Sequence, residues 1–357
     1  MSASTERNID YGFTDGTLSY RPTYFRGKYT EGETQTVPIV PGPTTEQLAA
    51  LKAELAGDTV KIYESPDGDG AVETVLLNHE APEANGLTIY GMGIGGNFYH
   101  PVGTRDVFAL AAANPDQRLM VMNNAGSEGS SLIPREVMQE MLRTGSYQRK
   151  GEWLLHVLGR ELETYGEDVA FWGNSAGGRV AMGLAASFGE KGAKAANVRV
   201  VDPLSVKQRS ALGVMWGFAS QAGDQGKYRA SPYGGTEETD EKTANLFAAL
   251  PNLFAALRAL PDNGFRYPAV MGKAAGFEED LEAAMAATRG DFSFIVPERS
   301  QFTPLQEMRE AMGRAAVLQP GDRRLYSVLR HSHTIMSAEA GSRPMATLYE
   351  LPKHDSQ

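Results

Sequence analysis

A regular alternation of short apolar segments with longer helical ones is the feature that most constrains the fold of this sequence. The predicted strands are at 59–64, 72–77, 86–90, 118–122, 169–172, 198–201, 292–296 and 324–329, and the clearest helical patterns are at 105–113, 153–165 and 178–188. Such alternation is typical of right-handed βαβ crossovers, in which helices cover both faces of a parallel sheet. The sequence therefore predicts an α/β fold with a mostly parallel, eight-stranded sheet.

Two parts of the chain depart from this alternation. Residues 1–58 form an N-terminal extension that is irregular or hairpin-bearing at first and then begins a short helix near Thr44. Residues 204–290 form a helical block between the sixth and seventh predicted strands. We therefore expect an α/β core at 59–203 and 291–357, with the block at 204–290 inserted as a helical cap.

Charge and composition argue against several classes of function. The chain carries 44 acidic and 34 basic residues and a net charge of -10, which disfavours nucleic acid and anionic lipid as partners. Without cysteine it has no disulfide, thiolate nucleophile, Cys-ligated zinc or iron–sulfur cluster. No apolar run approaches the roughly 18 residues of a membrane helix, and the first residues do not resemble a secretory signal. We therefore expect no membrane span and a cytoplasmic protein.

The chemistry of the chain is concentrated around Ser175. The sequence Gly-Asn-Ser-Ala-Gly at 173–177 follows the predicted strand at 169–172 and precedes a helix of small residues. A nucleophile elbow needs this strand-turn-helix context, because the sharp turn strains the serine backbone and brings neighbouring elements too close for a Cβ. The other interpretation is a glycine-rich turn that serves only packing.

A nucleophilic serine requires a general base. The chain has six histidines, and His331 and His333 come just beyond the last predicted strand. That position places them at the carboxyl edge of a parallel sheet, where Ser175 is also expected. We assign the base to His333 and keep His331 as the alternative, because the end of the strand is predicted only to within about two residues.

Over about residues 59–342, the chain resembles the α/β-hydrolase fold superfamily. The elbow follows the fifth strand, the helical insertion follows the sixth, and the histidine pair follows the eighth, as in that superfamily. The glycine run at 91–96 is similar to its His-Gly-x-Gly oxyanion segment, with Tyr90 in place of the histidine. The resemblance implies that the backbone N–H groups of Met92 and Ala176 form an oxyanion hole. The other interpretation of the glycine run is a dinucleotide-binding loop.

The acid of the predicted triad has two candidates. Ser300 occupies the position after the seventh strand at which many members of the superfamily have aspartate, and a hydroxyl cannot stabilise an imidazolium as a carboxylate does. Asp202, after the sixth strand, resembles an acid position used by some lipase-like members, and Glu298 lies two residues before Ser300. Asp202 is our first choice and Glu298 the alternative. The other interpretation of Asp202 is a purely structural one, in which it caps the turn at the end of the sixth strand.

These residues predict a serine hydrolase that cleaves a carboxylic ester or a related acyl substrate through an acyl-enzyme. No metal or organic cofactor is needed. Trp216 and Phe218, in the expected cap, indicate a small-molecule substrate with an apolar part, although core packing explains such side chains equally well. One alternative is an acyltransferase or thioesterase that uses the same acyl-enzyme. Another is a non-catalytic protein of this fold that binds a ligand or partner.

Overall fold

The computed structural model describes residues 16–26, 28–93, 96–99, 101–126, 129–204, 206–214, 216–217, 266–319, 321–331 and 342–355. Parts of the predicted site lie in the gaps, among them residues 94 and 95 of the glycine run. His333 and Phe218 lie outside the described residues, as does most of the expected cap. Among the helices that are described, none is both long and apolar enough to cross a membrane.

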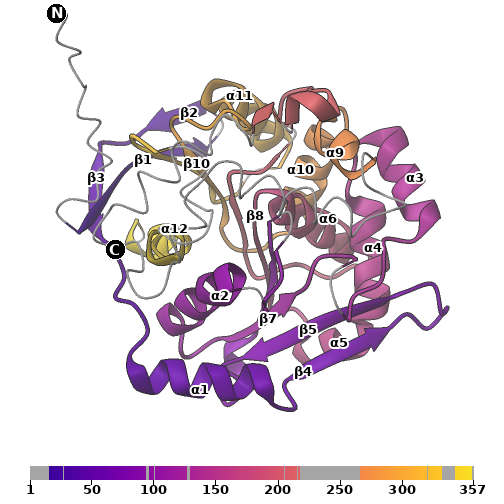
Figure 1. Ribbon diagram of the computed structural model, residues 1–357. Coiled ribbons are helices and arrows are strands. Elements are labelled where there is room, and N and C mark those ends of the chain that lie inside the picture. The colour runs from indigo at the N-terminus through magenta and orange to yellow at the C-terminus, as the bar shows by residue number, and fades with distance from the viewer. Residues whose placement is uncertain are drawn as a thin grey trace, which may run out of the picture.

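A mixed sheet of eleven strands forms the centre of the described structure (Figure 1). The strands are β1 (Thr17–Arg26), β2 (Lys28–Glu31), β3 (Gln35–Pro38), β4 (Val60–Glu64), β5 (Ala71–Leu77), β6 (Leu87–Gly91), β7 (Arg118–Met122), β8 (Val169–Asn174), β9 (Val198–Val201), β10 (Phe292–Pro297) and β11 (Arg323–Val328). Their order is β2-β1-β11-β10-β9-β8-β6-β7-β5-β4, and β3 pairs with β1. The six strands from β11 to β7 in this order are parallel to one another. The predicted α/β class and mostly parallel sheet are confirmed.

The three strands beyond the predicted eight come from the N-terminal extension. β1 pairs antiparallel with β11, with Tyr20 opposite Val328, and Leu18 and Tyr20 are fully buried. Pro22 lies within β1, opposite Tyr326, and proline in an apolar run argues against a strand when only the sequence is read. The extension is therefore an integral edge of the sheet, which the sequence pattern did not predict.

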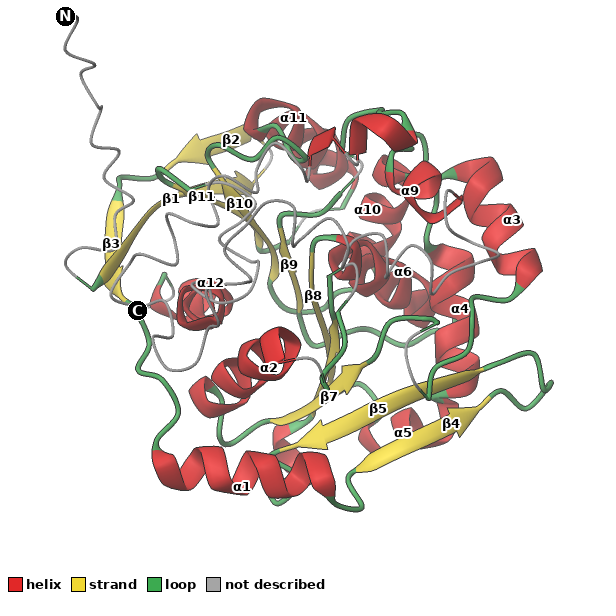
Figure 2. Ribbon diagram, viewed as in Figure 1, coloured by secondary structure: helices red, strands yellow, loops and turns green. Residues whose placement is uncertain are grey.

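Helices cover both faces of the sheet (Figure 2). The described helices are α1 (Thr45–Ala56), α2 (Pro101–Ala113), α3 (Arg135–Thr144), α4 (Gln148–Val157), α5 (Gly159–Tyr165), α6 (Ala176–Glu190), α9 (Arg266–Met271), α10 (Phe277–Ala286), α11 (Leu305–Leu318) and α12 (Ser342–His354). Side chains of α1, α2 and α12 join one apolar core, and those of α3, α4, α5, α6, α10 and α11 join the other. Each face of the sheet thus has its own core, as expected of a buried parallel sheet.

Local sequence accounts for where several of these helices begin and end. Thr44 is the N-cap of α1, where it forms a capping box with Gln47. The single helix predicted at 153–165 is divided into α4 and α5 at Leu158, where Gly159 follows. Glycine weakens a helix interior, which favours a break at this position.

The C-terminal part of the predicted cap, which the structure describes, contributes to the core. α10 packs against α6 and α11, and its Phe277, Leu281 and Met285 are buried. α10 therefore belongs to the helical layer over the sheet. The cap assignment for residues 218–265 remains a prediction, because they lie outside the described residues.

Candidate active site

Ser175 occupies the sharp turn between β8 and α6. Its backbone has φ 53° and ψ -122°. This conformation is strained for any residue that has a Cβ. The Ser175 N–H donates to the carbonyl of Val201 at 2.9 Å, which ties the turn to the end of β9. The hydroxyl thus lies at the carboxyl edge of the parallel strands, in the backbone geometry of a nucleophile elbow.

The glycines around Ser175 allow two elements to approach closely. A Cβ at Gly177 would overlap the backbone carbonyl of Gly91, and a Cβ at Gly173 would overlap that of Gly177. The first turn of α6 therefore lies directly against the end of β6. These contacts explain why Gly173 and Gly177, two residues before and after the serine, are both glycine.

The glycine run after β6 lies beside the serine. A Cβ at Gly93 would be 3.4 Å from the Cβ of Ser175. Asn124, after β7, donates from its Nδ2 to the carbonyls of Gly93 at 2.5 Å and Gly96 at 3.1 Å, which holds the segment in place. Met92 is buried in this segment. The predicted oxyanion segment and the elbow are therefore neighbours in the structure.

Tyr90, in place of the superfamily's histidine, connects this segment to the elbow. It is almost completely buried, and its hydroxyl donates to Oδ1 of Asn174 at 3.0 Å. The ring packs edge-on against Tyr349 of α12, with 5.8 Å between ring centroids. Burial raises the pKa of Tyr90 well above its ordinary value, so the hydroxyl stays protonated as a donor.

Replacing Tyr90 by Phe should therefore lower the free energy of unfolding by about 1–3 kcal/mol, since the buried Oδ1 of Asn174 loses its donor. Urea denaturation followed by circular dichroism measures this loss. The matched control is Tyr29→Phe, at an exposed tyrosine, which should change stability by less than about 0.5 kcal/mol. Equal effects of the two substitutions would contradict the role given to the Tyr90 hydroxyl.

Asp202 is buried at the end of β9. It is fully inaccessible to solvent, has φ 44°, and donates its backbone N–H to Ile295 of β10 at 2.8 Å. Its Oδ2 accepts a hydrogen bond from the Ser300 hydroxyl at 2.7 Å. Ser300, which stands where many members of the superfamily have their acid, thus binds the carboxylate supplied by the neighbouring strand.

Glu298 has a different environment. Its side chain is exposed, and its Oε2 accepts from the backbone N–H of Arg330 at 2.9 Å. A solvated carboxylate stabilises a nearby imidazolium less than a buried one, because water screens the charge. The surroundings of the two carboxylates therefore favour Asp202 as the acid of the predicted triad.

His331, the alternative base, follows β11 and is 1% exposed. Its backbone carbonyl accepts from the N–H of Arg299 at 2.8 Å. Burial, together with the charges of Arg299 and Arg330, lowers the pKa of His331 to about 3. An imidazole held neutral in this way is a poor proton acceptor, which favours His333 as the base.

Trp216, the described member of the expected substrate-binding pair, is 74% exposed. Gly217, beside it, lies against the ring of Phe302, since a Cβ at Gly217 would be 2.8 Å from that ring. The segment that carries Trp216 is therefore close to Ser300 and to the Asp202 side of the site. Within the described part of the chain, no three or more His, Asp or Glu side chains gather as metal ligands.

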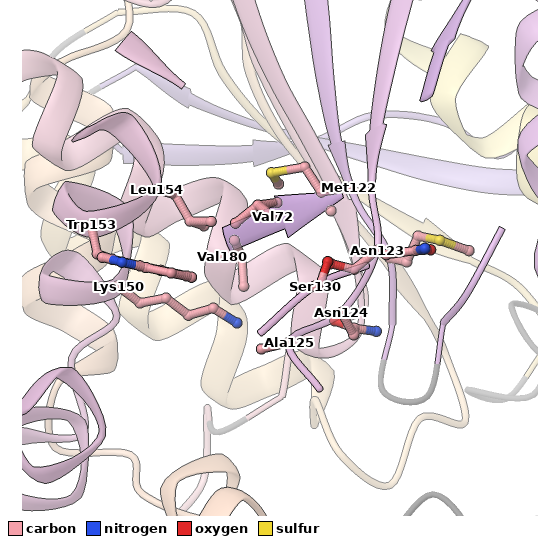
Figure 3. A pocket seen from close by; sticks show the side chains of 12 residues that line it. Val72, Met122, Asn123, Asn124, Ala125, Ser130, Lys150, Trp153, Leu154 and Val180 are labelled. Carbon is pink, nitrogen blue, oxygen red and sulfur yellow. The ribbon is translucent and has the colours of Figure 1, made fainter. Parts of the chain in front are cut away.

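A small cavity beside the glycine run was not predicted from the sequence. Its volume is about 20 Å³, enough for about one water molecule, and it is partly open to solvent (Figure 3). Its described lining is Val72, Gly91, Met92, Met122, Asn123, Asn124, Ala125, Ser130, Lys150, Trp153, Leu154 and Val180. In the sequence, Lys150 stands among polar residues at the start of a helix and has the pattern of a surface lysine.

Comparison with known proteins identifies the fold. No family model matches the sequence, and no curated protein matches it. Among solved structures, an esterase from Rhodococcus sp. is similar, with a TM-score of 0.53 at 15% identity, covering 84% of this chain and 99% of that one. A bromoperoxidase from Bacillus anthracis gives a TM-score of 0.51 at 13% identity, covering 84% and 100%. The chain has the α/β-hydrolase fold.

Proposed function

We propose that this protein is a serine hydrolase that cleaves a carboxylic ester or a related acyl compound. The observation that carries the proposal is the strained backbone of Ser175 at the turn between β8 and α6, with the glycine run after β6 beside it. A buried carboxylate, Asp202, at the end of the next strand supports it. The similarity to an esterase agrees with this function at the level of the fold.

In the proposed mechanism, the Ser175 hydroxyl attacks the substrate carbonyl while His333 accepts its proton. Asp202 orients the imidazole and stabilises the imidazolium, and the N–H groups of Met92 and Ala176 stabilise the oxyanion of the tetrahedral intermediate. His333 then returns the proton to the leaving alcohol, and the acyl-enzyme forms. Water, activated by His333, attacks the acyl-enzyme and releases the acid and Ser175.

The donor and the acceptor of the acyl group distinguish this hydrolase from the two alternative enzymes. An acyltransferase would use the same steps with an acceptor other than water, and a thioesterase would begin from a thioester. Trp216 and Phe218 would contact an apolar part of the substrate. We favour hydrolysis of an oxygen ester, because an esterase is among the similar structures.

Labelling with a fluorophosphonate tests the proposal. We expect intact-mass spectrometry to find one adduct on the folded wild type, with peptide mapping placing it on Ser175, and none on Ser175→Ala. Heat-denatured wild type is the control for labelling outside an active site and should remain unmodified. Turnover of a p-nitrophenyl ester by the wild type should accompany the adduct.

Two results would contradict the proposal. An adduct that persists in Ser175→Ala would remove Ser175 as the nucleophile. A folded wild type with neither adduct nor ester turnover would favour the non-catalytic protein that binds a ligand or partner.

A further inference from the structure

Ser300 contacts the proposed acid of the site through its side chain. It lies in the loop between β10 and α11, is 8% exposed, and donates from its hydroxyl to Asp202 Oδ2 at 2.7 Å. The same oxygen accepts the backbone N–H groups of Phe302 at 3.2 Å and Thr303 at 3.1 Å. A hydroxyl has one proton to donate and two lone pairs that accept. Because the two N–H groups occupy the acceptor side of the Ser300 oxygen, its proton is directed at the carboxylate.

The loop that carries Ser300 is fixed to the segments on both sides of it. It follows β10, which lies between β9 and β11 in the sheet. The Thr303 hydroxyl donates to the carbonyl of Pro203, the residue after the proposed acid. On the other side, the Arg299 N–H donates to the carbonyl of His331 at 2.8 Å, beyond the end of β11. The loop therefore joins the segment of the proposed acid to the segment that leads to the proposed base.

The orientation of the Asp202 carboxylate decides how well it can serve as the acid. An aspartate side chain turns about two torsion angles, so a fixed backbone does not by itself aim either oxygen at an imidazole. A catalytic group must be held within about 0.5 Å of its productive position. The hydrogen bond from the anchored Ser300 hydroxyl selects one orientation of the carboxylate and offsets part of the cost of burying its charge.

The identity of residue 300 suits this role. Asp202 already brings a carboxylate within hydrogen-bond distance of this position. A second carboxylate there would be repelled by the first, and two such groups would share a proton. A neutral donor stabilises the carboxylate of Asp202 without adding a competing charge.

We propose that Ser300 is a positioning residue of the active site, which orients the Asp202 carboxylate toward the catalytic histidine and acts on the reaction only through that carboxylate. The inference rests on the proposed function and adds to it a residue that touches neither the substrate nor the reacting atoms.

Ser300→Ala tests this role. We expect kcat for a p-nitrophenyl ester to fall about 10- to 100-fold, the range of a hydrogen bond to a charged group, while KM stays within about twofold of wild type. The carboxylate stabilises the imidazolium of the transition state, so its misorientation lowers kcat and leaves substrate binding unchanged. The matched control is Ser187→Ala, at a buried serine whose hydroxyl donates to the carbonyl of Gln148 at 2.9 Å. This control should leave kcat unchanged.

The same substitution in Asp202→Asn separates positioning from a structural effect. Without a carboxylate to orient, Ser300→Ala should change the remaining kcat by less than about twofold, whereas damage to the loop would lower kcat by the same factor in both backgrounds. Circular dichroism establishes that each variant is folded. If Ser300→Ala does not fold, Ser300→Cys, whose thiol is a weak donor, replaces it, with kcat expected to fall at least about threefold beside Asp202 and less than about twofold beside asparagine.

Three results would overturn the proposal. They are a kcat in Ser300→Ala within twofold of wild type, equal losses in the two backgrounds, and an equal loss in Ser187→Ala. Each of them leaves the wild type active, so the proposed function would stand. A wild type with neither ester turnover nor a fluorophosphonate adduct would overturn both the proposed function and the role of Ser300.

Discussion

Asp202→Asn is expected to lower kcat for ester hydrolysis by about 10,000-fold, in line with the loss of a carboxylate from a serine triad. The amide oxygen of asparagine can still accept the hydrogen bond from Ser300 Oγ, which Asp202 accepts at 2.7 Å, so the protein should keep its fold. What is lost is the buried negative charge that stabilises the imidazolium. Steady-state turnover of a p-nitrophenyl ester, with circular dichroism to establish folding, measures the effect.

Glu298→Gln is the matched control for this substitution. Glu298 is exposed and accepts the backbone N–H of Arg330, a contact that glutamine can also make. We expect kcat within about twofold of wild type, because no buried charge is removed. The reverse pattern, with turnover lost in Glu298→Gln and kept in Asp202→Asn, would make Glu298 the acid.

Arg179→Met is expected to lower the free energy of unfolding by about 3–5 kcal/mol. Arg179 is fully buried in α6 and donates to Asp280 Oδ2 at 2.8 Å and to the carbonyl of Gly145 at 2.9 Å. Its guanidinium also lies over the rings of Tyr147 and Phe277. Methionine keeps much of the volume but leaves the carboxylate of Asp280, which is also fully buried, without its cation.

Urea denaturation measures this loss, and Arg314→Met is the matched control. Arg314 pairs with Glu278, and both side chains are about half exposed, at 55% and 49%. Exposed ion pairs contribute little, so the control should lose less than about 1 kcal/mol. A similar small loss in Arg179→Met would show that the buried pair does not stabilise the helix that follows Ser175.

Local sequence was enough to predict the eight strands from β4 to β11 and the sharp turn at Ser175. Both depend on patterns within a short window: an apolar β-branched run, or a serine between glycines at the junction of a strand and a helix. The strand β1 escaped prediction because Pro22 interrupts it and its partner, β11, is distant in the sequence. Pairing across such a separation leaves no local signal.

The parts of the site that depend on the tertiary fold could be predicted only as alternatives. Asp202 and Ser300 are 98 residues apart and meet because β9 and β10 are neighbours in the sheet. The choice between Asp202 and Glu298 therefore depended on burial, which the sequence does not give. The burial of Lys150 could not be predicted for the same reason, since it follows from the packing of α4 against α6.

The attachment of β1 to β11 has a consequence for how the chain folds during synthesis. Tyr24, in β1, donates to Asp355, which follows it by 331 residues, at 2.6 Å. β1 therefore leaves the ribosome long before its partner strand exists, and its apolar residues Leu18 and Tyr20 have no native neighbours on β11 in that interval. Contacts of such high sequence separation slow folding and lengthen the exposure of apolar surface. We therefore expect a nascent chain of this protein to expose the apolar residues of β1 until β11 and α12 have been made.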